Sequence, residues 1–411
     1  EREKERERER EKEKEKEEDF FSQREREGGE EREKMKMNVV LLVALMVGVC
    51  VGSDIDWQSK KGVIMKNGER FYLKGVNWYG FETSVYSFHG LWANDYHEYF
   101  KFLQKNQFNA IRLPLSLDLV LGDYNPAQYI LTYCDKYGSK CNQDLVGKTS
   151  LETLDVFIDA ADEYGLYVLL DIHSLEPNDY YRNGLWYDSS HSEQDLINGW
   201  DVLIKRYNNS QAVFAADIFN EPFLATWGVG DNNTDWNVAA ERIGSNIASQ
   251  TNWLVFVQGT ATSPVCRDAC FYGEDLKGAL LHPVGLSISK RLVYSPHTYG
   301  PSVYPQPYFD MTDFPFNMDS IWSDHFGFIK DWKEEAVVLG EWGGPASGQN
   351  GDWETQLVKY LKSKDMTDNF FWSMNADGGD LGGLLLPDWK TPDQSKLNLV
   401  ASLVPEPSSY N

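Results

Sequence analysis

The chain has few cysteines for its length, and their spacing argues against a structural zinc site. Only five occur among 411 residues, and Cys50 lies in a segment that we expect to be removed. The other four are Cys134, Cys141, Cys266 and Cys270. They do not form the paired Cys-x-x-Cys units typical of zinc sites, so we predict no metal and no cofactor. Four cysteines allow three pairings, and in an oxidised protein we expect the local disulfides Cys134–Cys141 and Cys266–Cys270.

Basic side chains are also scarce. The sequence has 39 Lys and Arg against 63 Asp and Glu, which gives a formal net charge of −24. Residues 1–53 hold 16 acidic and 13 basic side chains, so they contribute −3 and the rest of the chain −21. A surface this acidic repels phosphate groups and other copies of itself. We therefore exclude nucleic acid as a partner and expect a soluble monomer.

Only one hydrophobic run is long, the sequence VVLLVALMVGVCV at Val39–Val51. It is too short for a comfortable membrane span, and no later stretch is long and apolar enough to be one. The basic residue Lys36 precedes the run and small residues follow it. Residues 35–52 therefore have the pattern of a signal peptide cleaved before Ser53, with a short signal anchor as the alternative. We expect secretion, an extracellular location, and no membrane association after cleavage.

Residues 1–34 have almost no apolar side chains and alternate Glu with Arg or Lys, as in EREKERERER. Strict alternation places like charges four residues apart, so the segment lacks the Glu-to-Lys pairs that stabilise a charged helix. It also has almost nothing to bury. We interpret it as disordered, or as a translated dinucleotide repeat that precedes a true start at Met35 or Met37.

No low-complexity linker follows Ser53, so residues 53–411 are predicted to form one domain. It opens with VIMKNGERFYL, a predicted β-hairpin with an Asn67-Gly68 turn. Eight strand-like runs follow, most of them separated by helix-period segments such as NDYHEYFKFLQKNQ and LETLDVFIDAADEYG. This alternation implies parallel strands, and no glycine-rich phosphate loop follows the first run, so an α/β fold of the (β/α)8 TIM barrel type is favoured over an open doubly wound sheet. The runs are Tyr72–Trp78, Ala110–Leu115, Tyr167–His173, Val213–Asn220, Trp253–Gly259, Leu292–Tyr299, Ala336–Trp342 and Asn369–Met374.

Polar side chains occur at the predicted carboxyl ends of the strands, where a (β/α)8 barrel carries its active site. The fourth run ends in Asn220 and Glu221, and Pro222 stops further pairing. The seventh ends in Glu341, so in a closed barrel the two glutamates face each other across the mouth. Facing carboxyl groups without a cluster of metal ligands suit glycosidic bond cleavage, in which one donates a proton and the other attacks or activates water. The other strand-end groups are Asn77, Trp78, Arg112, Asp171, His173, His297, Tyr299 and Trp372.

The chain from about Asp56 to Leu403 resembles glycoside hydrolase family 5, and especially its bacterial-type endo-β-1,4-glucanases. The matching stretches occur in order along the chain: GVNWYGFET, HGLWANDY, AIRLPLS, IFNEPF, LVYSPHTYGPSVYPQ, LGEWGG and FFWSMNADGGDLGGLL. The resemblance implies a retaining double displacement on cellulose or a related β-glucan, with Glu221 as the acid/base and Glu341 as the nucleophile. It also implies supporting roles in the site for Arg112, His173, Asn220, His297, Tyr299 and Trp372.

Elementary electrostatics explains how these residues could perform the implied roles. A cation at Arg112 and a phenol donor at Tyr299 would hold the pKa of the nucleophile low, whereas burial and the second carboxylate would keep the acid protonated. Asn220 is placed to hydrogen-bond the sugar 2-hydroxyl, and the two histidines are expected to position other groups rather than act as bases. Trp372 and Trp78 are predicted to be flat platforms for sugar rings.

Two alternatives remain open at the level of sequence. Mannanases, xyloglucanases and exo-glucanases of the same family share these site residues and differ in their loops. A non-catalytic carbohydrate-binding barrel is the other alternative, although it would usually lose a catalytic carboxylate and both are retained here. No separate carbohydrate-binding module is visible, so we expect action on soluble or amorphous glucan.

Overall fold

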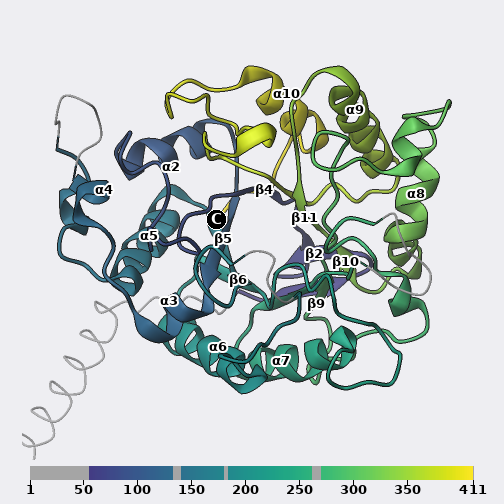
Figure 1. The fold of residues 1–411 in the computed structure, drawn as a ribbon, viewed down its shortest axis with the longest axis horizontal. Helices are drawn as coiled ribbons and strands as arrows, with labels where there is room; N and C mark the ends of the chain where they lie inside the picture. The colour runs from purple at the N-terminus through teal and green to yellow at the C-terminus, as the bar shows by residue number, and fades with distance from the viewer. Residues whose placement is uncertain (1–54, 133–139, 180–183, 262–269, 411) are drawn as a thin grey trace, which may run out of the picture. The chain divides into compact units, whose positions relative to one another are not determined.

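A parallel β-sheet lies at the centre of the described chain, and helices surround it (Figure 1). The computed structural model describes residues 55–132, 140–179, 184–261 and 270–410. Neighbouring strands follow the order β10–β9–β8–β7–β6–β5–β4–β12–β11. The strands are β4 (Lys74–Asn77), β5 (Ala110–Ser116), β6 (Tyr167–Ser174), β7 (Val213–Asp217), β8 (Leu254–Val257), β9 (Leu292–Tyr294), β10 (Ala336–Val337), β11 (Leu339–Trp342) and β12 (Asn369–Phe371).

The sheet closes into a barrel through its seventh strand. β10 and β11 are two parts of one run, separated only by Val338. β10 pairs in parallel with β9, and β11 pairs in parallel with β12, so the two ends of the strand order meet. The closed sheet therefore has eight strand positions, and the predicted (β/α)8 fold is confirmed.

Helices connect consecutive strands on the outside of the barrel (Figure 1). The predicted segments 94–107 and 151–165 contain α2 and most of α5. Thr149 and Glu152 form a capping box at the start of α5, and Gly165 ends the helix in the left-handed conformation. The α-helices are α2 (Tyr96–Lys105), α3 (Leu117–Gly122), α4 (Gln128–Thr132), α5 (Ser150–Tyr164), α6 (Glu193–Tyr207), α7 (Trp236–Gln250), α8 (Met318–His325), α9 (Gly348–Ser363) and α10 (Gln394–Leu403).

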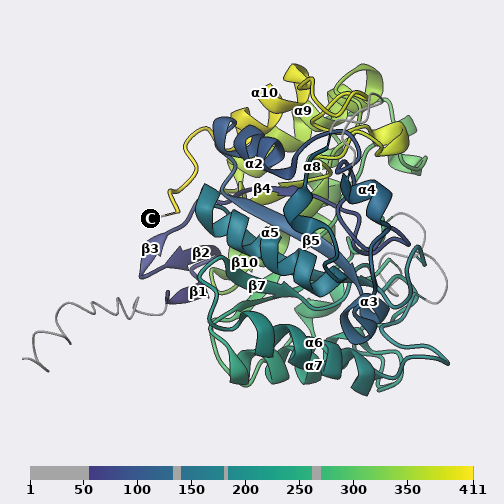
Figure 2. The same cartoon turned by 90° about the vertical axis from the view of Figure 1, so that its left-hand side faces the viewer.

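The predicted hairpin closes the amino-terminal end of the barrel (Figure 2). β2 (Val63–Lys66) and β3 (Glu69–Arg70) are antiparallel, and Asn67 and Gly68 between them both have positive φ, as the predicted turn requires. A third strand, β1 (Trp57–Lys60), pairs with β2 and was not predicted. Side chains from this small sheet join the residues inside the barrel in one apolar cluster that includes Trp57, Ile64, Phe71, Tyr167, Leu169, Phe214 and Phe256.

Alternation along β6 shows how the barrel separates its core from its site. Tyr167 and Leu169 belong to the inner cluster, whereas Val168 and Leu170 belong to the cluster that packs against the helices. Asp171 and His173 continue the inward series at the carboxyl end of the same strand. The interior therefore changes from apolar at the hairpin end to polar at the opposite end. Because both faces of each strand are buried, the runs look continuously apolar in sequence.

Some predictions fall on residues outside the described ranges. These are the charged segment 1–34, the signal peptide 35–52, and the cysteines Cys134 and Cys266, so the two disulfide pairings stay predictions. Within the described residues, no helix combines the length and the hydropathy that a membrane crossing requires.

The apolar floor of the barrel gives a prediction about stability. Trp57 is buried and makes edge contacts with Phe71 and Tyr167 at ring-centroid distances of 5.1 and 4.8 Å. Trp57→Ala should lower the free energy of unfolding by about 3–5 kcal/mol, because it removes a large ring from a closed cluster. Urea denaturation measures this loss, and Trp57→Phe, which keeps an aromatic ring, should lose less. A loss below about 1 kcal/mol for the alanine variant would contradict the role of the three-stranded sheet β1–β3 in closing the core.

Candidate active site

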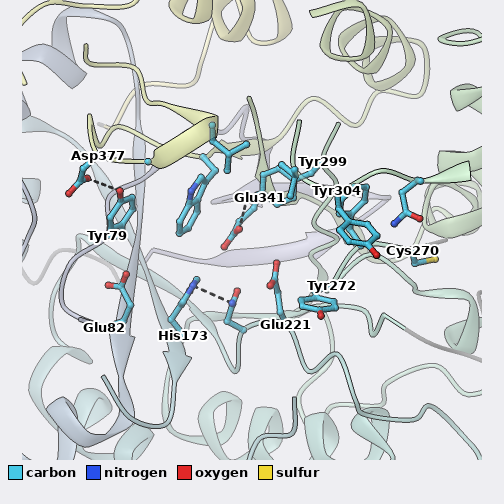
Figure 3. A pocket seen from close by; sticks show the side chains of 17 residues that line it. Tyr79, Glu82, His173, Glu221, Cys270, Tyr272, Tyr299, Tyr304, Glu341 and Asp377 are labelled. Carbon is cyan, nitrogen blue, oxygen red and sulfur yellow. Dashed lines mark hydrogen bonds between the residues drawn. The ribbon is translucent and has the colours of Figure 1, made fainter. Parts of the chain in front are cut away.

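A pocket of about 700 Å³ opens at the carboxyl ends of the barrel strands (Figure 3). It contains both predicted catalytic carboxyl groups, Glu221 and Glu341. Of the other predicted site residues, His173, Asn220, Tyr299 and Trp372 line it, whereas Arg112 and His297 lie buried beneath it. The remaining lining residues include Tyr79, Glu82, Phe271, Tyr272, Tyr304, Asp377 and Leu381.

The two glutamates lie close together with an imidazole between them. His297 Nδ1 is 2.9 Å from Glu221 Oε1 and 3.6 Å from Glu341 Oε2. One oxygen of each carboxyl group and one nitrogen of His297 all lie within 4.8 Å of one another. The nearest oxygens of the two carboxyl groups therefore approach more closely than the about 6.5–9.5 Å that leaves room for a water molecule between carboxyl groups.

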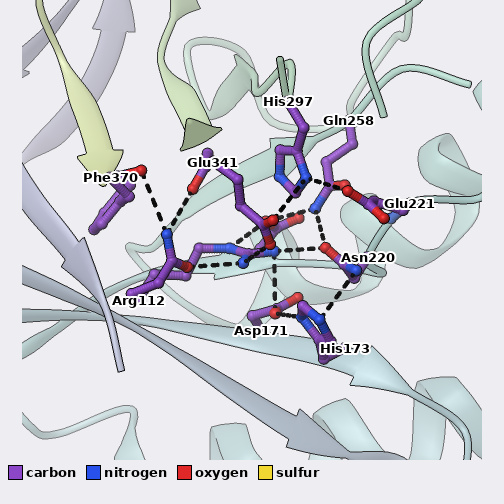
Figure 4. A network of polar contacts seen from close by, with 12 residues as sticks. Arg112, Asp171, His173, Asn220, Glu221, Gln258, His297, Glu341 and Phe370 are labelled. Carbon is purple, nitrogen blue, oxygen red and sulfur yellow. Dashed lines mark hydrogen bonds and ion pairs between the residues drawn. The ribbon is translucent and has the colours of Figure 1, made fainter. Parts of the chain in front are cut away.

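Arg112 lies fully buried under the pocket, where four hydrogen bonds and a further ion pair hold its guanidinium group (Figure 4). Its Nη1 donates to Glu341 Oε1 at 2.7 Å and to Asn77 Oδ1 at 2.9 Å. Its Nη2 donates to Asn220 Oδ1 at 2.9 Å and pairs with Asp171 Oδ2 at 3.0 Å. Its Nε donates to Asp217 Oδ2 at 2.9 Å. One guanidinium group therefore holds five side chains from the ends of four strands, β4, β6, β7 and β11, in a fixed arrangement.

Burial dominates the electrostatics of the two glutamates. It raises the pKa of Glu221 well above its usual range, and the neighbouring charge of Glu341 raises it further. Burial also raises the pKa of Glu341, against the opposing effects of the Arg112 cation and the Tyr299 hydroxyl, which donates to Glu341 Oε2 at 2.6 Å. The expectation of a low pKa for Glu341 is therefore wrong, because the loss of solvation outweighs its partners. Since only Glu341 contacts the guanidinium, a proton shared by the pair is more stable on Glu221.

Both histidines have low pKa values. Burial lowers the pKa of His173 to about 4 and that of His297 well below its usual range. His173 Nδ1 contacts Asp171 Oδ2 at 2.7 Å, and its Nε2 lies 3.3 Å from Asn220 Nδ2. Neutral imidazoles held by fixed neighbours fit the predicted positioning role.

The two predicted tryptophan platforms differ. Trp372 is half-buried and lines the pocket, with its ring nearly parallel to Tyr79 and to His173 at centroid distances of 5.4 and 5.7 Å. Trp78 is fully buried and packs edge-on against Tyr99 in the layer between sheet and helices, so the prediction that it stacks on sugar is wrong. Asn77 points into the barrel, and alternation along the strand turns the next side chain outward.

Several residues of the site were not assigned a role from the sequence. Asp217 lies inside an apolar run, where a charged residue is unusual and could have indicated a site residue. Gln258 is the last residue but one of the fifth run and is uncharged, so nothing in the sequence distinguishes it. Burial raises the pKa of both Asp171 and Asp217 to about 7, although Arg112 opposes it. Tyr79 adjoins Trp78 in a motif that was recognised, but only the side-chain direction shows which ring reaches the pocket.

The atoms between the two glutamates also resemble a metal site. Glu221, His297 and Glu341 have the donor types and the mutual distances that a metal ion would need. However, both oxygens of Glu341 already accept short bonds, from Arg112 and Tyr299. A guanidinium cation at 2.7 Å also repels a second cation. The donor set therefore suits proton transfer and nucleophilic attack better than metal binding.

Comparison with known proteins places this geometry in a family. Residues 66–378 match the family model described as cellulase (glycosyl hydrolase family 5). The chain is 35% identical to an endoglucanase of Paenibacillus polymyxa over 348 residues, covering 83% of this chain and 85% of that protein. It is 37% identical to the major extracellular endoglucanase of Xanthomonas campestris pv. campestris over 373 residues, covering 89% and 74%.

Solved structures agree with these sequence matches. The catalytic domain of the Xanthomonas campestris endoglucanase superimposes with a TM-score of 0.78 at 36% identity, covering 85% of this chain and all of that one. A hyperthermophilic endocellulase from Pyrococcus horikoshii gives a TM-score of 0.79 at 36% identity, covering 85% and 98%. The chain therefore belongs to glycosyl hydrolase family 5, the cellulase family, and is a glycoside hydrolase with a (β/α)8 barrel.

Proposed function

We propose that the protein is a secreted, retaining endo-β-1,4-glucanase that cleaves internal bonds of cellulose or a related β-glucan. Glu221 is its acid/base, Glu341 is its nucleophile, and it acts as a monomer without a cofactor. The observation that carries this proposal is the asymmetry between two facing carboxyl groups. Glu341 is held by a guanidinium and a phenol, whereas the side chain of Glu221 contacts an imidazole and, among the described residues, pairs with no lysine or arginine.

The different surroundings of the two carboxyl groups indicate which one acts as acid and which as nucleophile in the first chemical step. Glu221 gives its proton to the glycosidic oxygen as that bond breaks, and Glu341 attacks the anomeric carbon to form a glycosyl ester. Arg112 and Tyr299 keep the attacking carboxylate ionised and oriented. Trp372 and Tyr79 offer ring faces to the sugar, and Asn220 offers its side-chain amide to the 2-hydroxyl.

The second step follows from the charges of the same pair. Once Glu341 is esterified it no longer carries a charge, so the repulsion that raised the pKa of Glu221 is lost. Glu221, now deprotonated, becomes the base that removes a proton from water. Water then attacks the anomeric carbon and releases Glu341. A single pair of carboxyl groups thus supplies acid, nucleophile and base in turn.

Substrate and location rest on the relatives and on the sequence. Several of the relatives carry the name endoglucanase, and one is called a major extracellular endoglucanase. The signal-peptide pattern of residues 35–52 supports the same location for this chain, with residues 53–411 as the catalytic domain. The excess of acidic side chains argues against a nucleic acid partner.

Replacing the proposed acid should slow the hydrolysis of substrates with poor leaving groups much more than that of substrates with good ones. Glu221→Gln should lower hydrolysis of natural glucan by about 10²- to 10⁴-fold, because its leaving oxygen needs a proton. An aryl cellobioside with an activated phenol leaving group should still react with Glu341 in the first step. Stopped-flow measurement of the phenol burst tests this.

Glu82→Gln is a matched control, since Glu82 is another buried carboxyl group that lines the pocket. It should not distinguish between the two kinds of leaving group. Equal loss of both substrates in Glu221→Gln would refute the assignment of the acid.

The Tyr299 hydroxyl generates a pH prediction. Its hydrogen bond stabilises the ionised form of Glu341 and so lowers that pKa. In Tyr299→Phe the pKa of Glu341 rises, so the acidic limb of kcat/KM should move to higher pH. The maximal rate should fall by at least about tenfold, as expected for a lost bond to a charged group.

The control is Tyr304→Phe, which removes a hydroxyl from the same pocket. Within the described chain, no hydrogen bond joins the Tyr304 hydroxyl to either glutamate, so its acidic limb should stay in place. An unchanged acidic limb in Tyr299→Phe would show that Glu341 is not the group that must be ionised.

A further inference from the structure

Gln258 directly follows the carboxyl end of β8, and its side chain lies beside the proposed acid Glu221 (Figure 4). Its side chain is fully buried. Its Oε1 accepts the backbone N–H of Glu221 at 2.8 Å. Its Nε2 donates to Asp217 Oδ2 at 2.8 Å and to Asn220 Oδ1 at 3.3 Å. The donor and acceptor sides of the amide are thus both engaged, and its partners fix its orientation.

The backbone of Glu221 needs such support. Its φ of +45° lies in the left-handed region, which residues other than glycine seldom adopt. The next residue is Pro222, which further restricts the conformation of the residue before it. A disfavoured backbone persists only where its surroundings determine it, and the bond from Glu221 N–H to Gln258 is one such determinant.

Gly273 closes the space behind the same two side chains. It has a φ of +76°, and its carbonyl accepts from Gly259 N at 2.9 Å and from His297 N at 3.4 Å. A Cβ atom at this position would lie 3.1 Å from Gln258 Oε1 and 3.4 Å from Glu221 Cγ. The packing therefore leaves little free space into which Glu221 could relax.

Gln258 also connects the proposed acid to the cation of the proposed nucleophile. Asp217 Oδ2 accepts both from Gln258 Nε2 and from Arg112 Nε, and Arg112 in turn holds Glu341. Four hydrogen bonds, the first donated by the backbone N–H of Glu221, thus join the two halves of the proposed catalytic pair. This connection lies below the pocket, because Gln258, Asp217 and Arg112 are buried and are not among the lining residues.

We propose that Gln258 is a positioning residue for proton donation. It holds the backbone of Glu221 so that its carboxyl group reaches the leaving glycosidic oxygen, and it ties that placement to the Arg112 cluster. The inference rests on the proposed function, in which Glu221 is the acid. A side chain that merely fills space would affect all substrates alike, whereas this role concerns only reactions that need a proton.

The test uses Gln258→Met, which keeps the length of the side chain and removes both hydrogen-bonding groups. Its kcat on natural glucan should fall about 10- to 100-fold, with KM changed by less than about twofold. The first-step rate with an activated aryl cellobioside should fall by less than about threefold. Gln356→Met is the matched control, since Gln356 is buried and donates to Asp319 at 2.8 Å away from the pocket. It should alter neither rate.

Gln258→Glu provides a second readout. Its carboxylate keeps an acceptor for Glu221 N–H but presents an oxygen to Asp217 where the amide presented a donor. Protonation restores the donor, so the activity of Gln258→Glu relative to the unmodified enzyme should increase as pH falls. A thermal melt of each variant shows whether it is folded. If Gln258→Met does not fold, Gln258→Glu provides the test.

The outcomes separate this inference from the proposed function. Equal losses on natural and activated substrates in Gln258→Met, or no loss at all, would overturn the role of Gln258. So would a Gln258→Glu variant whose relative activity does not depend on pH. If Glu221→Gln itself lost both substrates equally, the assignment of the acid would fail, and the inference with it. If Glu221→Gln discriminates and Gln258→Met does not, only the inference fails.

Discussion

The fully buried guanidinium of Arg112 is the constraint on which the rest of the site depends. A charge removed from water is costly unless it is paired and hydrogen-bonded, and here the guanidinium makes four hydrogen bonds at 2.7–2.9 Å and a further ion pair with Asp171 at 3.0 Å. The barrel makes this possible because it brings the ends of several strands to one point. Lysine could not replace the guanidinium, since an ammonium group has only three donors and no planar fork.

The position of Arg112 determines how the carboxyl groups of Glu221 and Glu341 differ. Both are buried, and burial alone would raise both pKa values. Direct contact with the cation favours the ionised form of Glu341, and the resulting negative charge favours the protonated form of Glu221. The apolar floor built by the hairpin keeps water from the other end of the barrel, so these interactions act in a medium of low polarity.

The sequence was sufficient for the architecture because strands buried on both faces give long apolar runs, and eight such runs are distinctive. It also located Glu221 and Glu341, since a charged residue at the end of an apolar run is conspicuous. It did not reveal that Trp78 points outward, because residues 77 and 78 both end a strand and only pairing shows which one enters the barrel. Gln258 was missed for a different reason: an uncharged amide after a strand resembles an ordinary loop residue. The sign of the pKa shift at Glu341 required the depth of burial, which composition does not provide.

In the proposed mechanism Glu341, and not Glu221, forms a covalent bond to the sugar. The most direct test is inactivation with an aryl 2-deoxy-2-fluoro-β-cellobioside, whose fluorine slows breakdown of the ester. Proteolysis and mass spectrometry then locate the fluorocellobiosyl group. We expect one fluorocellobiosyl group on the peptide that contains Glu341, and none on the peptide that contains Glu221. A label on Glu221, or continued turnover of the reagent without any label, would contradict it.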